Sequence, residues 1–432
     1  MKIERKEIAQ GVFLNHLYSD KFKTAFMSFT FLSQLCRETA SMNALIPFVL
    51  HRGTRTYGDM EQISNRLDEL YGTAVEPSVR RFGEIQGIGL VASFPETGFL
   101  PSGENILKDV IGFASEMLLN PATRGGLLLP KYVDSEKQNL IDLIRSRINE
   151  KRSYAMARCI EEMCCYEDYS VGRFGSEDDC QSINYKKLTA RYREVVQTCP
   201  LEIFYCGRAG VGEVASLLKD AFSLMPRGEI NYDIGTDIRM NSVEEEPRFY
   251  TEELNVTQGK LVMGYRLGEV MEDPDYAAIS VFNAVFGSGV TSKLFMNVRE
   301  KLSLCYYASS TVDKKKGIML VNSGIEFDKF DEAKAEIVHQ LDEVRSGNIT
   351  DDELSFAKKS LVSDCASMLD APPELENYYL SQIISGMDIS PEEMAELISF
   401  VTKEDVIRVA NSVECDLIYF LKGGSNDENE ED

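Results

Sequence analysis

Arg299 and Tyr306 are two hydrogen-bond donors that lie close together in the sequence of this 432-residue chain. A guanidinium and a phenol can both donate hydrogen bonds to an oxygen on which negative charge develops. The two residues lie seven positions apart in the stretch SKLFMNVREKLSLCY, residues 292–306. Taken alone, this pattern is more typical of an ordinary ion pair made by Arg299 and of a tyrosine in the core.

Histidines, which could bind zinc or move protons, are few and scattered. His16, His51 and His339 are far apart in the sequence, and no second histidine lies four residues from His51. Two imidazoles must lie one helical turn apart to face one metal from a single helix. The histidines therefore predict no metal site.

The ten cysteines form no Cys-x-x-Cys pair. Cys164 and Cys165 are adjacent, which is too close for an ordinary disulfide. We expect free thiols in a reducing cytoplasm, most of them buried as small apolar side chains. A metal cluster of Cys159, Cys164 and Cys180 is the alternative interpretation.

The composition is that of a globular protein with a strongly acidic surface. The formal charge is −24, of which five charges lie in the tail 427–432, and the remaining chain still carries −19. This charge disfavours nucleic acid as a partner, because phosphate binding needs clustered Lys and Arg. It is compatible with basic or neutral partners, or with solubility alone.

Neither a membrane anchor nor a secretion signal is expected. No run of about 18 apolar residues occurs, so no transmembrane helix is predicted. The N-terminal residues 1–10 are charged and contain no apolar signal core. We therefore expect a cytoplasmic protein that does not bind membranes.

Apolar periodicity predicts a mixture of strands and helices in both halves of the chain. In the first half we expect strands at 14–18, 23–32, 73–79, 84–94 and 201–206, and helices at 41–51, 59–72, 104–119, 134–165 and 188–196. In the second half we expect strands at 248–256, 260–265, 305–312, 317–326 and 417–421, and helices at 276–286, 291–302, 328–346, 351–369 and 372–386. Each half mixes antiparallel strands with helices, which points to an α+β fold.

The two halves share one order of elements, which indicates an internal repeat. In each half an apolar helix ends at a glycine, an amphipathic helix follows, and a tyrosine leads into a strand. The distance from glycine to tyrosine is 18 residues from Gly53 and 19 residues from Gly287. The alternative is two unrelated α+β domains of similar element order. The expected domains are 1–225 and 247–423, joined by a linker at 226–246 and followed by an acidic disordered tail at 424–432.

The order of these elements, the sequence Leu70-Tyr71-Gly72 and the stretch Val298–Tyr306 resemble the pitrilysin/insulinase-like zinc peptidases, the inverzincin family. The resemblance covers residues 5–423 and is strongest to the non-catalytic subunits of the short, two-domain bacterial type related to mitochondrial processing peptidase. It implies an α+β fold of two homologous mixed α/β domains that form a half-clamshell. Each domain is expected to be a largely antiparallel sheet covered by helices.

The resemblance also implies that this chain has lost the zinc site of its family. Catalytic members hold zinc with the two histidines of His-x-x-Glu-His, and the matching positions here are Ala44, Pro47 and Phe48. The third ligand lies seven residues after a glutamate that matches Glu136, and its position holds Leu143. Asp142 lies one position earlier, but both imidazoles would still be absent. We expect the apolar segment to pack as core, with Pro47 disturbing its helix.

In contrast, Arg299 and Tyr306 match the Arg and Tyr that family members use to contact substrate. The resemblance therefore implies a non-catalytic subunit of a heterodimeric zinc metallopeptidase, inactive alone. Its sister subunit would carry the intact motif and the zinc, and this chain would help to shape a chamber for peptides. The long glycine-rich loop of the mitochondrial non-catalytic subunit is absent, because Gly287-Ser288-Gly289 is only a short turn.

Two other functions remain open from the sequence. One is a catalytically inactive homodimer of the same fold that binds a peptide or protein, or has a structural role. The other is an enzyme with different chemistry, for which we find no phosphate-binding glycine loop and no Ser/His/Asp arrangement. An intact His-x-x-Glu-His in a neighbouring reading frame would favour the heterodimer.

Overall fold

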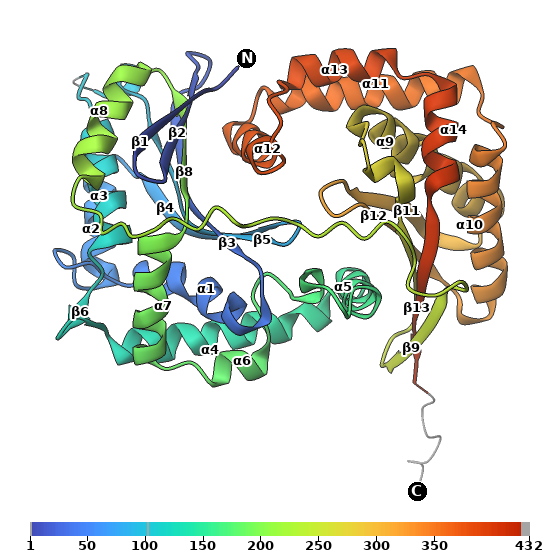
Figure 1. Ribbon diagram of the computed structural model, residues 1–432, viewed down its shortest axis with the longest axis horizontal. Helices are drawn as coiled ribbons and strands as arrows, with labels where there is room; N and C mark the ends of the chain where they lie inside the picture. Colours follow the sequence, from blue (N-terminus) through green and yellow to red (C-terminus); the bar gives the residue numbers. More distant parts are fainter. Residues whose placement is uncertain (1, 102, 425–432) are drawn as a thin grey trace, which may run out of the picture. The chain divides into compact units, whose positions relative to one another are not determined.

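The computed structural model describes residues 2–101 and 103–424, which form two compact units (Figure 1). Unit 1 comprises Met1–Arg145, Val171–Thr236 and Met368–Ser390, and unit 2 comprises Ser146–Ser170, Asp237–Ser367 and Pro391–Asp432. The tail that we expect to be disordered lies outside the described residues, apart from Gly424. No helix in the described ranges is both long and apolar enough to cross a membrane.

Unit 1 is built on a six-stranded sheet with the order β1-β2-β8-β3-β5-β4. All neighbouring strands are antiparallel except β2 and β8. Its central strand β3, TAFMSFTFLSQ, is dense in aromatic and apolar residues and is buried along almost all of its length. The strands are β1 (Glu4–Ala9), β2 (Val12–Tyr18), β3 (Thr24–Gln34), β4 (Ala74–Phe82), β5 (Ile85–Pro95) and β8 (Leu201–Gly207).

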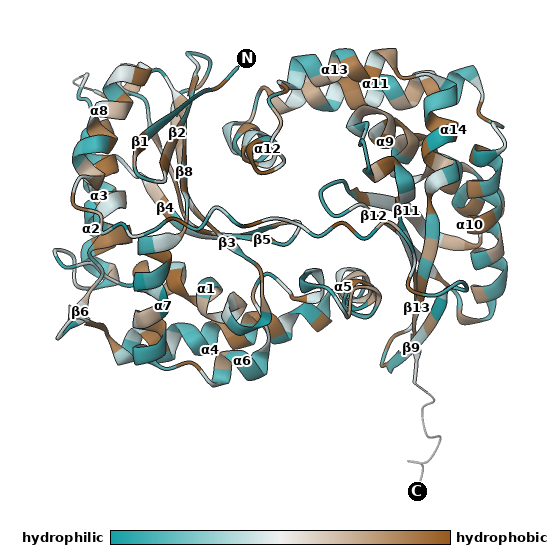
Figure 2. Cartoon of the chain, viewed as in Figure 1, coloured by the Kyte–Doolittle hydropathy of each residue, from teal (hydrophilic) through white to brown (hydrophobic). Residues whose placement is uncertain are grey.

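Helices on unit 1 begin and end where local sequence directs them. Asp59 caps α2 by accepting a hydrogen bond from the backbone N–H of Gln62, as the sequence predicts. The apolar faces of the helices and the sheet form one core, and the exposed helix faces are hydrophilic (Figure 2). The helices of this unit are α1 (Arg37–Leu50), α2 (Met60–Glu69), α3 (Leu107–Leu119), α4 (Pro130–Ser146), α6 (Glu177–Gln181), α7 (Tyr185–Thr198), α8 (Val211–Phe222) and α12 (Pro372–Ile384).

Unit 2 is built on a five-stranded sheet with the order β11-β12-β10-β13-β9. Only the pair of β13 and β9 is parallel. The strands are β9 (Arg248–Leu254), β10 (Gly259–Arg266), β11 (Cys305–Asp313), β12 (Ile318–Ile325) and β13 (Glu414–Gly423), and the helices include α5 (Lys151–Met163), α9 (Tyr276–Asn283), α10 (Phe330–Arg345), α11 (Asp351–Met368), α13 (Pro391–Phe400) and α14 (Lys403–Ser412).

The two sheets have the same topology, which supports the internal repeat. The order β4-β5-β3-β8-β2 in unit 1 corresponds to β11-β12-β10-β13-β9 in unit 2. In both orders the first three pairs of neighbouring strands are antiparallel and the last pair is parallel. Unit 1 adds β1 beyond β2. The α+β fold of two homologous domains, each a largely antiparallel sheet covered by helices, is therefore confirmed.

Each unit also contains one helix that comes from the other half of the chain. The helix α5 follows α4 in the first half but packs on β10 and β13 of unit 2. The helix α12 follows α11 in the second half but packs on β8 and β3 of unit 1. The fold thus exchanges equivalent helices between its two repeats, which the sequence pattern did not predict.

Two local predictions differ from the structure. The expected long helix at 134–165 is two helices, because residues 147–149 form a 3₁₀ turn and α5 continues in another unit. The helix α1 begins at Arg37 and continues through Pro47 to Leu50, so the expected disturbance at Pro47 is wrong. Proline removes one backbone donor, but its position in the last turn leaves the other backbone bonds of the helix in place.

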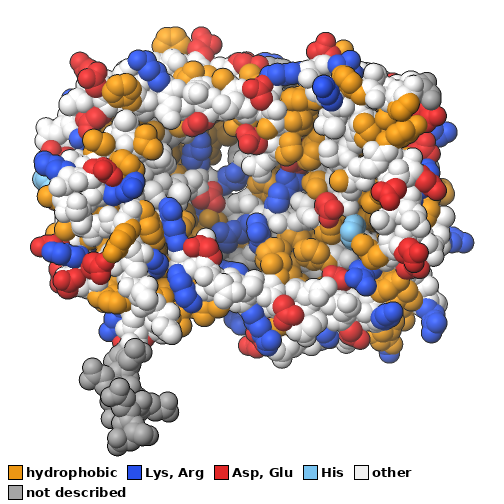
Figure 3. Space-filling model, turned by 180° about the vertical axis from the view of Figure 1, so that it is seen from behind, with side chains coloured by type: hydrophobic (Ala, Val, Ile, Leu, Met, Phe, Trp, Pro, Cys, Tyr) orange, Lys and Arg blue, Asp and Glu red, His pale blue; other side chains and the backbone are white. Residues whose placement is uncertain are grey.

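The visible surface carries both signs of charge. On the face of the molecule in Figure 3, acidic and basic side chains are interspersed with apolar ones. The excess of acidic residues therefore does not form one continuous acidic surface on that face.

Candidate functional site

The positions matched to the zinc motif lie on α1, which covers the sheet of unit 1. Ala44 is fully buried, Pro47 is buried, and Phe48 is partly buried against the same apolar core. None of these side chains carries an atom that can bind zinc or accept a proton. The expectation that the segment packs as core is confirmed.

The position of the third ligand likewise offers no donor. Leu143 lies on α4 and is 41 % exposed. Glu136 lies earlier on the same helix. Its buried carboxylate forms an ion pair with Arg52 at 3.2 Å and accepts a hydrogen bond from Asn139 at 3.1 Å. The residues at these family positions therefore do not fit a zinc ion.

The remaining metal-ligating side chains do not gather elsewhere. The ring of His51 contacts the carbonyl of Val75 at 2.9 Å, and the ring of His16 contacts the carbonyl of Ala209 at 2.8 Å. Among the described residues, no group of three His, Cys, Asp or Glu side chains could hold a metal.

The structure separates the three cysteines of the alternative metal cluster. Cys159 and Cys164 are buried in unit 2, and Cys180 is buried in unit 1. Burial raises the pKa of all three thiols, which keeps them protonated and makes them poor ligands at neutral pH.

Arg299 lies on η6 (Leu294–Lys301), a π-helix of unit 2. Its guanidinium lies over the ring of Phe295, 4.6 Å from the ring centroid, and its Nε lies 3.4 Å from the carboxylate of the adjacent Glu300. The side chain is 40 % exposed. π-Helical turns are rare and occur frequently at functional sites.

Tyr306 lies at the start of β11, at a β-bulge. Cys305 pairs with Ile325 and Tyr307 pairs with Gly324, so Tyr306 is the extra residue. The bulge follows Ser303, whose φ of 50° is in the left-handed region. A bulge redirects a side chain, and Tyr306 is 62 % exposed instead of packed in the core. The phenol donates a hydrogen bond to Glu326, which raises the pKa of Tyr306.

Arg299 and Tyr306 thus share one irregular segment of unit 2. Within residues 294–307 the chain forms a π-helix, a left-handed residue and a bulge. Both side chains are accessible. The guanidinium can donate to a ligand, and the phenol can do so in place of its hydrogen bond to Glu326. The ordinary interpretation of Tyr306 as a core residue does not fit its exposure.

Comparisons with known proteins identify the family of the chain. Residues 182–361 match the model of the family described as "Peptidase M16 inactive domain". The chain is 31 % identical to "Probable inactive metalloprotease YmfF" of Bacillus subtilis, over 97 % of this chain and 98 % of that protein. The chain belongs to the M16 metallopeptidase family. It is a homologue of inactive members, as its pitrilysin/insulinase-like sequence features predict.

Several solved structures share the whole fold. A conserved protein from Enterococcus faecalis is 27 % identical, with a TM-score of 0.89 over 99 % of this chain and 100 % of that chain. A peptidase M16 inactive domain from Pseudomonas fluorescens is 14 % identical, with a TM-score of 0.74 over 98 % of each chain. The second likeness supports the fold alone.

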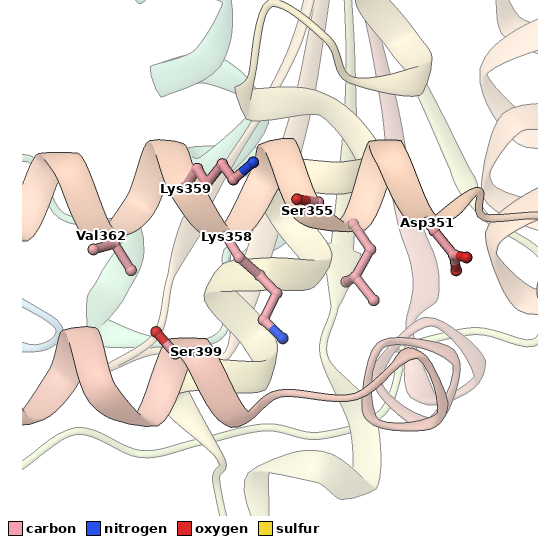
Figure 4. A pocket seen from close by; sticks show the side chains of 7 residues that line it. Asp351, Ser355, Lys358, Lys359, Val362 and Ser399 are labelled. Atoms are coloured by element: carbon pink, nitrogen blue, oxygen red, sulfur yellow. The ribbon is translucent and has the colours of Figure 1, made fainter.

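One groove of this M16 chain is lined by none of the family positions. It has a volume of about 550 Å³ and lies between α11 and α13 of unit 2 (Figure 4). The Lys358 ammonium crosses it and donates a hydrogen bond to the carbonyl of Val401 at 2.6 Å, which satisfies a backbone group at the end of α13. The lining residues are Asp351, Leu354, Ser355, Lys358, Lys359, Val362 and Ser399.

Sequence reasoning missed Arg152, Lys260 and Tyr307, which lie together in unit 2. Arg152 comes from the exchanged helix α5, and its neighbours come from strands more than 100 residues later. No sequence motif links them, since only the helix exchange brings them together.

Proposed function

We propose that this chain is the non-catalytic subunit of a heterodimeric M16 metallopeptidase, located in the cytoplasm. A sister subunit with an intact His-x-x-Glu-His motif would hold the zinc and the general base. This chain would help to shape the peptide chamber and would supply Arg299 and Tyr306 as donors to carbonyl groups of the bound peptide.

The observation that carries the proposal is the contrast between the two sets of family positions. Ala44, Phe48 and Leu143 offer no ligand. Arg299 and Tyr306 are exposed on an irregular segment of the backbone. A chain kept only as a scaffold would have no need for two exposed polar side chains at these positions.

Reconstitution with the sister subunit tests the proposal. We expect neither protein to cleave peptides alone, and the mixture to do so with one zinc per heterodimer. Arg299→Ala in this chain should lower kcat/KM about 100-fold, because a preorganised donor to a developing oxyanion is worth a few kcal/mol. Tyr306→Phe removes the other donor with little change in volume.

Lys301→Ala is the matched control, because Lys301 is an exposed cation on the same η6 helix. It should leave turnover unchanged. Normal turnover by a heterodimer that carries both Arg299→Ala and Tyr306→Phe would overturn the roles of these residues. A stable homodimer that ignores the sister subunit would favour the binding or structural function instead.

A further inference from the structure

Two cationic side chains lie over one aromatic ring in unit 2. The guanidinium carbon of Arg152, from α5, is 4.4 Å from the centroid of the Tyr307 ring, and the ammonium nitrogen of Lys260, from β10, is 5.7 Å from it. All three residues are half-buried. The arrangement therefore concentrates two positive charges at one partly desolvated place on the sheet.

Arg152 is held in position by neutral acceptors only. Its Nε donates to Oδ1 of Asn322 at 2.8 Å, and its Nη2 donates to Oγ of Ser309 at 2.8 Å. Asn322 is buried in the middle of β12, so it provides a fixed anchor. In the described part of the chain, Nη1 of Arg152 has no protein acceptor in a hydrogen bond.

Lys260 likewise has a neutral partner. Its ammonium donates to Oε1 of Gln258, which leaves two protons for another acceptor. Burial lowers the pKa of Lys260; Glu150 opposes this shift and Arg152 reinforces it. The Glu150 carboxylate is already used as the N-cap of α5, where it accepts from the backbone N–H groups of Arg152 and Ser153.

No carboxylate of the described residues forms an ion pair with either Arg152 or Lys260. By contrast, the half-buried cations Arg158 and Arg248 have acidic partners. Within the described ranges, each cation of the site is half-buried without a direct ion pair. The Glu150 carboxylate acts on both cations but is used as the N-cap of α5, so an incoming anion can add a direct charge-assisted contact. The planar guanidinium of Arg152 beside the ammonium of Lys260 suits a carboxylate, since both groups can donate charge-assisted hydrogen bonds to it.

We infer that Arg152 and Lys260 form a binding site for a carboxylate of an extended peptide. The carboxylate is either the C-terminus of the peptide or an acidic side chain, which present the same chemistry to the site. That the peptide is a substrate rests on the proposed function; the binding itself requires only this chain. The chain would therefore bind peptides with a suitably placed negative charge more tightly than peptides without one.

Binding to the purified full-length chain tests the inference without a sister subunit. Three probes share one neutral decapeptide sequence with an uncharged coumarin label at the N-terminus. The first has a free C-terminus, the second is amidated, and the third is amidated with one internal Glu. Fluorescence anisotropy should show that the first or the third probe binds about tenfold more tightly than the second, as expected for a charge-assisted contact. The probe that gains affinity identifies the source of the carboxylate.

Lys260→Met removes the charge but keeps an apolar stem over Tyr307, and it should abolish the tenfold preference. Lys260→Arg should keep most of it. Lys359→Met is the matched control, because the ammonium of Lys359 lies over an aromatic ring, Phe356, at a similar distance of 5.9 Å but outside the site. It should bind all probes as the wild type does.

Two results would overturn the inference. One is equal affinity of the wild type for all three probes, including no binding of any probe at millimolar concentration. The other is an undiminished preference in Lys260→Met. Thermal unfolding of each variant separates these outcomes from misfolding. Lys260→Met should leave the melting temperature nearly unchanged, because the side chain forms no ion pair in the described residues and its apolar stem is kept over Tyr307. Loss of activity in Arg299→Ala tests the proposed function independently, because Arg299 is not part of this site.

Discussion

At the scale of single residues, Ala44 and Phe48 have become part of the core of unit 1. Ala44 is fully buried among β-sheet and helix side chains, so the space that an imidazole needs is already filled. Zinc coordination depends on several ligands at once, and the loss of one removes the reason to keep the others. Leu143 shows this loss at a third position.

Restoring the two histidines alone should therefore not restore a zinc site. We expect the variant Ala44→His/Phe48→His to hold less than one zinc per chain after dialysis, measured by mass spectrometry of the metal. Its free energy of unfolding should fall by about 1–3 kcal/mol, because a larger side chain overpacks the core at Ala44. Adding Leu143→Glu gives the matched variant with a third ligand. Stoichiometric zinc in the double variant would contradict the expectation.

At the scale of elements, the exchanged helix α5 is fixed to unit 2 by a buried network of charges. The loop after α5 contributes Glu167, which pairs with Arg266 at 2.6 Å and with Lys316 at 2.6 Å. Arg266 also pairs with Asp416 at 2.8 Å, and Asp416 pairs with Arg248. These contacts join the end of α5 to strands β9, β10 and β13. Together with the apolar face of α5, these contacts specify where the helix docks.

Arg266→Met should destabilise unit 2, because it leaves Glu167 and Asp416 buried with fewer partners. Breaking a buried ion pair from one side costs about 3–5 kcal/mol, and urea unfolding at pH 7 should show a loss near the lower end, since Lys316 and Arg248 remain. Lys329→Met is the control, because its pair with Glu332 is exposed and should contribute less than about 1 kcal/mol. Equal stability of both variants would contradict the role of the network.

The same network predicts the direction of acid sensitivity. Burial alone would raise the pKa of Glu167, but hydrogen bonds from Arg266 and Lys316 outweigh it and lower the pKa below the ordinary 4.5. A carboxylate with a lowered folded-state pKa stabilises the fold above its unfolded pKa, and this contribution is lost as the pH falls through the folded value. The stability that depends on Glu167 is therefore lost below about pH 4.5.

The sequence pattern predicted most elements but not the partners of two of them. Apolar residues at helical spacing in 134–165 indicate helices, and the structure confirms helical conformation on both sides of residues 147–149. Periodicity describes one face of a helix and contains no information on which sheet that face covers. The docking of α5 depends on side chains more than 80 residues away, such as Arg248 and Asp416.

The same limit applies to the candidate site. The spacing of Arg299 and Tyr306 gained meaning only from the resemblance to a family, because many ordinary helices and strands contain such a pair. Their exposure depends on a π-helix and a β-bulge, which arise from local packing and not from a recognisable sequence signal. The pair of Arg152 and Lys260 could not be predicted either, because the helix exchange brings the two residues together.

At the scale of the whole molecule, the exchange of helices makes each repeat depend on the other half of the chain. In unit 1, Leu375 and Tyr379 of α12 pack against Phe26 and Phe204 of the sheet. In unit 2, three residues of α5 pack against apolar residues of β10, β12 and β13; they are Ala155, Cys159 and Met163. Neither sheet can bury this face with residues of its own half.

The two halves should therefore fold fully only together. We expect the separate fragments 1–236 and 237–424 to bind the dye ANS and to lack a cooperative thermal transition, because each leaves an apolar sheet face uncovered and carries an unattached helix. Co-expressed, they should form a 1:1 complex by size-exclusion chromatography, since α5 and α12 supply the missing contacts in both directions. Deleting 151–163 from the first fragment removes α5 and should weaken this complex. Cooperative unfolding of either fragment alone at the temperature of the intact chain would show that the exchange is dispensable for stability.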